Sequence, residues 1–326
     1  MFHDTITNLF FFCVISLVIF LIIKKNISFF ANSLYLIDSN IQSKNTPLLG
    51  GVFLSLALLI IYIILLVNSN KNYFHSEFVY VFAIFVLGAF DDAKNIRAVL
   101  RLLFSALIVF FIIQTNEVLI VNFLYIDKFY ILNNHFSIFF TILCFLLFQN
   151  ALNLMDGVNC LVLSFCLLIL IILLLVDQNH FEIKLSLIIT SIYLLYLNYK
   201  NITFLGDSGV YTLSFIISIF TIEAYKYNYQ IFDLADILIL FSLPGYDMFR
   251  LFVQRTINKK HPFTKDNNHL HHFLIAKSYG PAQISIIYLF VTILLFSLNY
   301  FFNLSFVISV ILSVVFYLLI LNYAKN

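Results

Sequence analysis

The feature that most constrains this chain of 326 residues is a series of long apolar stretches, separated by short polar connections. A helix needs about 20 mainly apolar residues to cross roughly 30 Å of hydrocarbon. A soluble fold has too little interior for so many such stretches, because hydrophobic residues make up 62% of the sequence and charged ones only 10%. The sequence therefore predicts an all-α polytopic membrane protein, with residues 1–326 as a single integral-membrane domain.

The apolar stretches predict about 11 transmembrane helices. The expected segments cover residues 7–23, 49–67, 77–90, 98–114, 117–126, 136–153, 158–176, 184–198, 209–223, 234–252 and 282–322. The last is long enough for two spans divided near Asn303, whereas 117–126 is too short to cross alone and would form a half-helix or a hairpin. We interpret 7–23 as a retained first span, since it lacks the basic segment and the small-residue cleavage site of a signal peptide.

The distribution of lysine and arginine orients the predicted spans. With the N-terminus outside, the outer connections hold Lys71, Lys128, Lys184 and Lys226, and the inner ones hold the remaining fourteen of the 18 basic residues. Cytoplasmic connections of membrane proteins carry such an excess. The charge pattern thus predicts an outside N-terminus and a cytoplasmic C-terminus, and it assigns every polar cluster described below to the cytoplasmic face.

The first polar cluster is the pair Asp91-Asp92 at the expected inner end of a span. Adjacent carboxylates repel each other and are costly near lipid unless a cation offsets them. The pair could form an acidic loop neutralised by Lys94 and Arg97, or it could bind a metal or a substrate proton.

Amides and a third carboxylate follow in the segment Asn150-Ala-Leu-Asn153-Leu-Met-Asp156-Gly157. Asn150 and Asn153 are three residues apart and share one face of a helical turn. Such amides can bridge neighbouring helices. The Asp156-Gly157 pair at a helix break makes ligand recognition the better interpretation.

A fourth carboxylate lies between two glycines in Gly206-Asp207-Ser208-Gly209, directly before a span. Glycine lets the backbone approach a ligand closely, and a helix start presents free N–H groups to anions. Asp207 could merely cap a tight turn. Alternatively it could bind Mg²⁺, which proteins usually hold through a few carboxylates together with substrate phosphates.

The longest inner connection, 253–281, is basic and contains His269-Leu-His271-His272. Three histidines could bind a transition metal, but the surrounding lysines and arginines disfavour a cation. Basic residues beside histidines suit a phosphate-rich ligand better, and a solvated basic loop is the remaining alternative.

These clusters together indicate a class of reaction. Carboxylates for Mg²⁺, a basic loop for phosphates and amides for a base or sugar imply a nucleotide-activated substrate, and the membrane position implies a lipid phosphate as the second substrate. Phosphoryl transfer at the membrane surface follows as the class. A secondary transporter is the alternative, although transporters place ionisable groups near the bilayer centre. A scaffold protein would leave the clusters unexplained.

The motifs also resemble those of a known family. They occur in the order Thr46-Pro47-Leu-Leu-Gly50-Gly51, Asp91-Asp92, NALNLMDG, FLGDSG and HPF-x₂-D-x₂-HLHH. This order resembles the polyprenyl-phosphate N-acetylhexosamine-1-phosphate transferases, the glycosyltransferase 4 family. The resemblance covers about residues 44–275, and the combination of motifs is more specific than any one of them.

The resemblance implies roles for individual residues. It implies catalytic roles for Asp91, Asp92, Asp156, His269, His271 and His272, metal ligation by Asp207, Asp91 and Asn153, and nucleotide or cofactor contacts from Asn150, Asn153, Lys44 and Arg255. Many members carry a second acid where this chain has Asn159, which is a departure from the pattern.

The resemblance further implies transfer of a sugar-1-phosphate from a UDP-sugar to undecaprenyl phosphate. UMP would be released, and the product would initiate O-antigen, capsule or another cell-wall glycan. The expected cofactor is Mg²⁺, with Mn²⁺ as the alternative. The expected partners are the two substrates and membrane lipid, without nucleic acid, and a homodimer is allowed. The expected location is the bacterial cytoplasmic membrane, with the active site on its cytoplasmic face.

Overall fold

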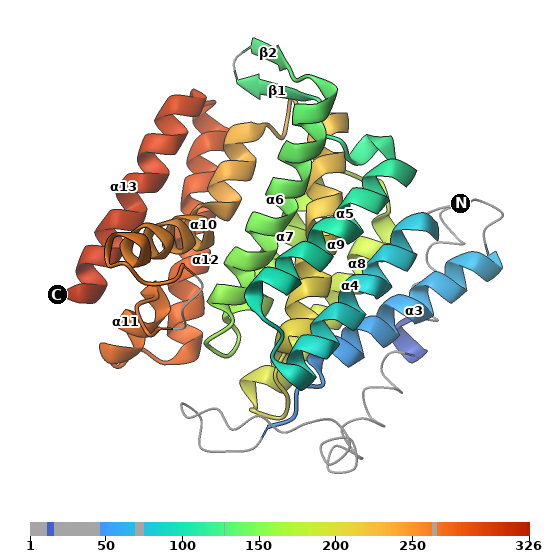
Figure 1. Ribbon diagram of the computed structural model, residues 1–326, viewed down its shortest axis with the longest axis horizontal. Coiled ribbons are helices and arrows are strands. Elements are labelled where there is room, and N and C mark those ends of the chain that lie inside the picture. The colour runs from blue at the N-terminus through green and yellow to red at the C-terminus, as the bar shows by residue number, and fades with distance from the viewer. Residues whose placement is uncertain (1–11, 16–45, 69–74, 127, 263–265) are drawn as a thin grey trace.

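The computed structural model describes residues 12–15, 46–68, 75–126, 128–262 and 266–326 (Figure 1). Its helices are α3 (Gly50–Asn68), α4 (His75–Lys94), α5 (Ala98–Thr115), α6 (Asn134–Met155), α7 (Leu161–Val176), α8 (Phe181–Tyr199), α9 (Gly206–Asn228), α10 (Leu234–Ile257), α11 (Leu270–Ala276), α12 (Pro281–Phe302) and α13 (Phe306–Lys325). The predicted first span at 7–23 lies outside the described residues except for Phe12–Ile15, which are helical, and Lys44 lies outside them too.

The helical bundle has the character of a membrane protein. Among the described residues, seven helices are long and apolar enough to cross a membrane, and α7 is a shorter apolar helix. Large apolar side chains such as Phe104, Phe290 and Leu318 are at least half exposed on the outside of the bundle, where lipid rather than water would contact them. The prediction of an all-α polytopic membrane protein is confirmed.

Two of the predicted segments, 282–322 and 117–126, are not single continuous helices in the structure. The division of 282–322 near Asn303 is confirmed, because α12 ends at Phe302 and Asn303 has a φ of 45° that interrupts the helix. The short stretch 117–126 forms a 3₁₀ turn (Glu117–Leu119) and strand β1 (Phe123–Ile126). This strand pairs antiparallel with β2 (Lys128–Ile131) in a two-stranded hairpin.

Helix α9 lies at the centre of the bundle, and its apolar stretch is completely buried by the surrounding helices. It contacts α4, α3, α6 and α7. Its hydroxyl side chains stay satisfied in this apolar environment because they donate to carbonyl oxygens of the preceding turn, as Thr212 does to Ser208 and Thr221 does to Ile217. This internal pairing lets a helix with many Ser and Thr residues be buried.

The bundle has two distinct ends (Figure 1). The hairpin end carries β1 and β2, whereas the opposite end, here called the site end, holds the C-termini of α4, α6 and α10 and the N-termini of α9 and α11. All four polar clusters of the sequence lie at the site end, since contacts join Asp92 to Asp207 and Gly157 to His271.

Candidate active site

Asp92 joins the end of α4 to the start of α9. Its Oδ1 accepts the backbone N–H of Asp207 at 2.7 Å, and its Oδ2 accepts that of Ser208 at 3.0 Å. The first N–H groups of a helix have no partner within the helix, and its positive N-terminal end favours an anion. Gly206 has a φ of 73°, and a Cβ there would lie 3.0 Å from Asp92 Oδ2. Glycine is therefore needed at 206, and Asp92 itself fills the anion position of this helix.

The Thr-Pro-x-x-Gly-Gly motif fastens the turn that precedes Asp207. Gly50 N–H donates to the Phe204 carbonyl and Gly51 N–H to the Leu205 carbonyl, each at 3.0 Å, while Phe204 N–H donates to the Pro47 carbonyl at 3.0 Å. A Cβ on Gly50 would lie 2.6 Å from the Leu205 Cα. The close backbone contact explains both glycines as structural residues that set the position of α9.

Asp91 is held by three donors. Its Oδ2 accepts from Arg101 Nη1 at 2.6 Å and from the Tyr211 hydroxyl at 2.9 Å, while its Oδ1 accepts the Ile96 N–H at 2.8 Å. The side chain is only 2% exposed. Arg101 Nη1 also lies 3.9 Å from Asp207 Oδ2, so one guanidinium connects two carboxylates.

Sequence reasoning missed Arg101 and Tyr211 as site residues. In the sequence Arg101 is one of the basic residues that orient the spans, and Tyr211 lies within the apolar segment 209–223. An available signal was the position of Arg101 in the first turn of the helix that follows Asp91-Asp92. A buried acid pair beside a span requires a nearby cation.

The carboxylates of Asp156 and Asp207 lie in the part of the site where the least positive charge offsets the acids. Asp156 follows the last turn of α6 and keeps part of its surface exposed. Desolvation by the surrounding protein, and then the negative charge of Asp92, raise the pKa of Asp156 to about 7. Asp207 is 29% exposed and senses the charges of Asp91, Asp92 and Asp156. Among the described residues, these four carboxylates have one ion-pair partner, Arg101.

The arrangement fits a Mg²⁺ ion shared with a phosphate ligand better than a closed protein cage. In the described part of the chain no three His, Cys, Asp or Glu side chains form a metal-binding group. Mg²⁺ is commonly bound by one or two carboxylates together with phosphates and water. Both oxygens of Asp91 and of Asp92 already accept hydrogen bonds, so Asp156 and Asp207 are the residues that would hold the ion. Asn153, one turn before Asp156, is also partly exposed.

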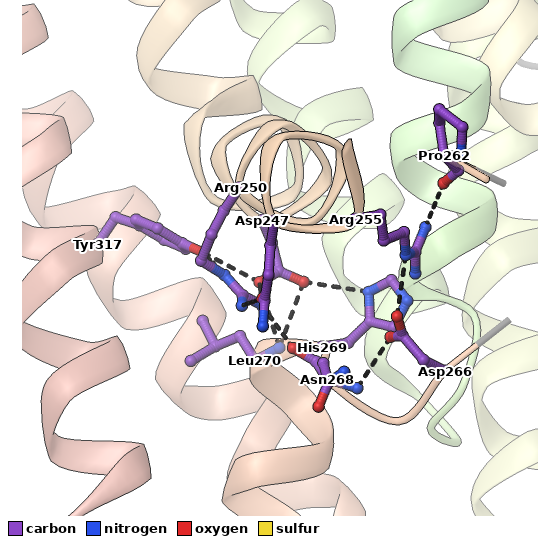
Figure 2. Close-up of polar contacts among 10 residues, drawn as sticks. Asp247, Arg250, Arg255, Pro262, Asp266, Asn268, His269, Leu270 and Tyr317 are labelled. Atoms are coloured by element: carbon purple, nitrogen blue, oxygen red, sulfur yellow. Dashed lines mark hydrogen bonds and ion pairs between the residues drawn. The ribbon is translucent and has the colours of Figure 1, made fainter. Parts of the chain in front are cut away.

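The histidine motif begins the short helix α11 and is held by α10 (Figure 2). His269 Nδ1 lies 3.2 Å from Asp247 Oδ2, and Asp247 also accepts the Leu270 N–H. The ring of His269 stacks on that of His271, with centroids 5.3 Å apart. The histidines thus form one cluster rather than separate ligands on a loop.

His271 connects α11 to the loop that carries Asp156. It is 1% exposed, and a Cβ added to Gly157 would lie 2.6 Å from its Nε2. Desolvation, and then the neighbouring His272 and His269, lower the pKa of His271 to about 3. The ring is therefore neutral at physiological pH and packs against the loop instead of attracting phosphate by charge. Desolvation and His269 also lower the pKa of His272.

The predicted nucleotide contacts Arg255 and Asn150 have other partners in the structure. Arg255 is 5% exposed, and it donates from Nε to Asp266 Oδ2 at 2.9 Å and from Nη1 to the Pro262 carbonyl at 2.7 Å (Figure 2). These contacts shape the connection between α10 and α11. The Asn150 amide lies 3.6 Å from the Met248 sulfur, and Asn150 lines a small recess together with Arg101.

An apolar cavity of about 540 Å³ lies between α6, α9 and α10 and reaches the hairpin. Its walls include Val121, Leu124, Phe140, Cys144, Phe145, Leu147, Phe148, Ala151, Thr221, Ile222, Tyr225, Ile237, Phe241, Gly245, Met248 and Phe249. Leu147 and Phe249 are 47% and 67% exposed at its rim. A Cβ on Gly245 would meet nothing within 4 Å. At the end away from the hairpin, the cavity reaches Met248, which contacts Asn150 at the edge of the acidic site.

A second, polar recess of about 490 Å³ adjoins the Asp156 loop. It is lined by Asn159, Cys160, Tyr199, Lys200, Asn201 and the first residues of α12. Asn159 donates to the Asn201 side chain, so the two amides are mutually oriented. The recess thus provides a cation, Lys200, and amide groups, none of which is among the site residues predicted from the sequence.

The fold and the site define a class of protein: an α-helical membrane protein with a carboxylate cluster at one end, flanked by an apolar cavity and a polar recess. Residues 75–225 match the family model of glycosyl transferase family 4. The match includes Asp91, Asp92, Asp156 and Asp207.

The chain is also similar to a curated protein. The chain is 26% identical over 208 residues, 60% of its length, to the "Probable undecaprenyl-phosphate N-acetylglucosaminyl 1-phosphate transferase" of Bacillus subtilis (strain 168). The aligned part of the chain spans 56% of the length of that relative.

Proposed function

We propose that this protein transfers an N-acetylhexosamine-1-phosphate from a UDP-sugar to undecaprenyl phosphate. UMP leaves, and the lipid-linked sugar initiates a cell-surface polysaccharide. The observation that carries the proposal is the junction of an apolar cavity with a carboxylate site through the contact between Met248 and Asn150. The match to glycosyl transferase family 4 and the name of the Bacillus subtilis relative support the same reaction.

The apolar cavity suits the isoprenoid chain of the acceptor. Its walls are almost entirely hydrocarbon and aromatic side chains, so burial of isoprene units there removes apolar surface from contact with polar groups. A chain that lies between α6 and α10 would bring its phosphate to the site end, beside Asn150 and Arg101. The arrangement holds the nucleophile and the sugar donor close together, which is most of what phosphoryl transfer needs from a protein.

The polar recess suits the nucleotide. Amide groups such as those of Asn159 and Asn201 can donate to and accept from the edge of uracil, and Lys200 can approach a phosphate as a point charge. The diphosphate would then extend from the recess past Asp156 toward Asp207. Asn159 stands where many family members carry an acid, so contacts at this position are neutral in this chain.

Mg²⁺, held by Asp156 and Asp207, would offset the charge that develops on the leaving UMP. Arg101 keeps Asp207 in place and neutralises Asp91. Asp91 is ion-paired with Arg101 and accepts two further hydrogen bonds, and this pairing favours its ionised form without a proton from the substrate. The acceptor phosphate has a second pKa near 6 and is largely dianionic at neutral pH, so the site needs no general base. Asp92 retains a positioning role at the start of α9.

The positive-inside pattern orients the site end toward the cytoplasm, where nucleotide sugars are made. The proposed location is therefore the bacterial cytoplasmic membrane. A secondary transporter would carry ionisable groups near the middle of its helices, whereas Asp91, Asp156 and Asp207 lie at helix ends. A homodimer remains a proposal drawn from the resemblance alone.

The test is release of UMP by the full chain in lipid nanodiscs. Release should require a UDP-N-acetylhexosamine, undecaprenyl phosphate and Mg²⁺ together. Release without the lipid phosphate, or undiminished release in EDTA, would contradict the proposal.

Two variants test which substrate binds in each cavity. Gly245→Leu fills space in the apolar cavity and should raise KM for undecaprenyl phosphate about tenfold, with little change in KM for the UDP-sugar. Gly280→Leu makes the same change at the wall of the polar recess and should leave KM for the lipid unchanged. Equal effects of both variants on both substrates would refute the assignment.

A further inference from the structure

Asp247 is a buried carboxylate on α10 that the proposed reaction does not use directly. It is 5% exposed and accepts hydrogen bonds from groups on α10, α11 and α13 (Figure 2). Its Oδ1 accepts from Arg250 Nη2 at 2.8 Å and from the Tyr317 hydroxyl at 3.0 Å. Its Oδ2 lies 3.2 Å from His269 Nδ1, and the Leu270 N–H points at both oxygens, at 3.3 and 3.2 Å.

We propose that Asp247 is a positioning residue: it fixes the tautomer of His269 and the start of α11, and so sets the histidine cluster against the loop that carries Asp156. The inference rests on the proposed transferase function. It adds to that function a residue that acts through the histidines rather than by touching substrate.

Asp247 and His269 form a carboxylate–imidazole pair. An ionised carboxylate can only accept a hydrogen bond, so the imidazole nitrogen that faces it must carry the proton. His269 is thereby held with the proton on Nδ1, and its Nε2 has a lone pair when the ring is neutral. Stacking on His271, at an interplanar angle of 11°, fixes the plane of the ring.

Asp247 also accepts a backbone hydrogen bond at the start of α11. The Leu270 N–H is the first helical donor of α11, and Asp247 is its acceptor. Helix α11 has only seven residues, so few internal hydrogen bonds define its position. Because His271 of this helix packs on Gly157, a displacement of α11 would move the turn that contains Asp156.

Asp247 is also linked to the C-terminal helix α13. The Tyr317 hydroxyl of α13 donates to Asp247 and accepts from Arg250 Nε at 2.8 Å. Arg250 also donates to the Asn268 carbonyl, immediately before His269. Tyr317 is 3% exposed, so its hydroxyl group depends on these partners. Helix α13 therefore supports the site through one hydroxyl group, although it lies outside the matched region 75–225.

The experiment uses the full chain in nanodiscs with three single substitutions. Asp247→Asn removes the charge that selects the tautomer, and Tyr317→Phe removes one supporting hydroxyl. Tyr323→Phe is the matched control, because it makes the same chemical change on the same helix but breaks only an exposed hydrogen bond to Tyr279.

Activity should separate the three variants. A misplaced histidine cluster lowers kcat, and we expect a fall of about 100-fold for Asp247→Asn and about tenfold for Tyr317→Phe, with KM values within about twofold. Tyr323→Phe should behave as the wild type. If Asp247→Asn fails to fold, Tyr317→Phe carries the test. A kcat within about twofold of the wild type in the folded variants would overturn the proposal.

A spectroscopic readout makes the test independent of turnover. In protein with ¹⁵N-labelled histidine, one ring should show the tautomer with the proton on Nδ1, and its signal should disappear in His269→Gln. Asp247→Asn should shift this ring toward the other tautomer, whereas Tyr323→Phe should not. Persistence of the Nδ1–H tautomer in Asp247→Asn would overturn the inference. Absence of transferase activity in the wild type would instead refute the proposed function and leave this measurement interpretable.

Discussion

Helix α9 carries one carboxylate near each end, and the surroundings of the two differ. At the site end Asp207 lies among three further carboxylates, with Arg101 3.9 Å away. At the hairpin end Glu223 lies 3.6 Å from His180 Nε2, close to the buried pair of Lys184 and Asp177. Lys184 is 0% exposed, and its ammonium donates to the Asp177 carboxylate at 2.7 Å and to the Asp177 carbonyl at 2.8 Å.

The difference lies in charge balance and access. At the hairpin end acids face basic groups, and the cluster ties the connection between α7 and α8 to α9. Around Asp207, by contrast, four carboxylates share Arg101 as their one ion-pair partner among the described residues. Two cavities adjoin this cluster. An uncompensated charge beside a membrane span is costly. Where the fold keeps such an excess next to open space, a cationic ligand or metal is the natural complement, whereas a balanced and closed cluster serves stability.

The largest effect expected from this contrast is on Asp207. Asp207→Asn keeps the size of the side chain but removes the charge that would hold the metal. UMP release should fall by about 1,000-fold or more, since the charge stabilises the transition state. The melting temperature should not fall, because a mutually repelling carboxylate is lost. Turnover assays combined with thermal melting of the purified protein measure both quantities, and retained turnover would move the metal toward Asp156 alone.

The second effect is on stability at the hairpin end. Lys184→Met leaves Asp177 buried without its cation, and breaking such a pair costs about 3–5 kcal/mol. Lys226→Met is the control, because Lys226 is partly exposed and donates to a single carbonyl, that of Ile120. Denaturation in detergent should rank the two variants in that order. The folded fraction of Lys184→Met should keep wild-type KM values, and altered KM values would show that the two ends are coupled.

The smallest effect is a pH dependence of stability from Asp156. Its pKa is raised from 3.8 to about 7, so the folded state keeps its proton over a range in which the unfolded state has lost it. The free energy of unfolding therefore falls as pH rises from about 4 to about 7 and then levels off. Asp156→Asn never ionises, so in EDTA its melting temperature should exceed that of the wild type by a few degrees at about pH 8 and by less at about pH 5. An equal difference at both pH values would contradict the raised pKa.

Local sequence predicted much of the fold because membrane helices are defined by length and hydropathy. The turn at Asn303 and the gathering of the four polar clusters at one end were both correct. For 117–126 the sequence left a half-helix and a hairpin as alternatives. Local sequence could not choose between them, because β1 and β2 are short and their pairing depends on contact with Tyr225 of α9, which accepts the N–H of Tyr125. The individual roles of the predicted site residues stay predictions.

Apolar length and residue type are local properties, so the sequence alone predicts a bundle of membrane helices with acids, amides and histidines at their ends. Which of the acids are already paired depends on the tertiary structure. Asp91 meets Tyr211 across 120 positions and Asp92 meets Ser208 across 116, and no local pattern encodes a contact at that separation. The same packing joins Asp247 of α10 to Tyr317 of α13. Hydrogen-bond partners in a helical bundle depend on which faces of distant helices meet, and that is a property of the whole fold.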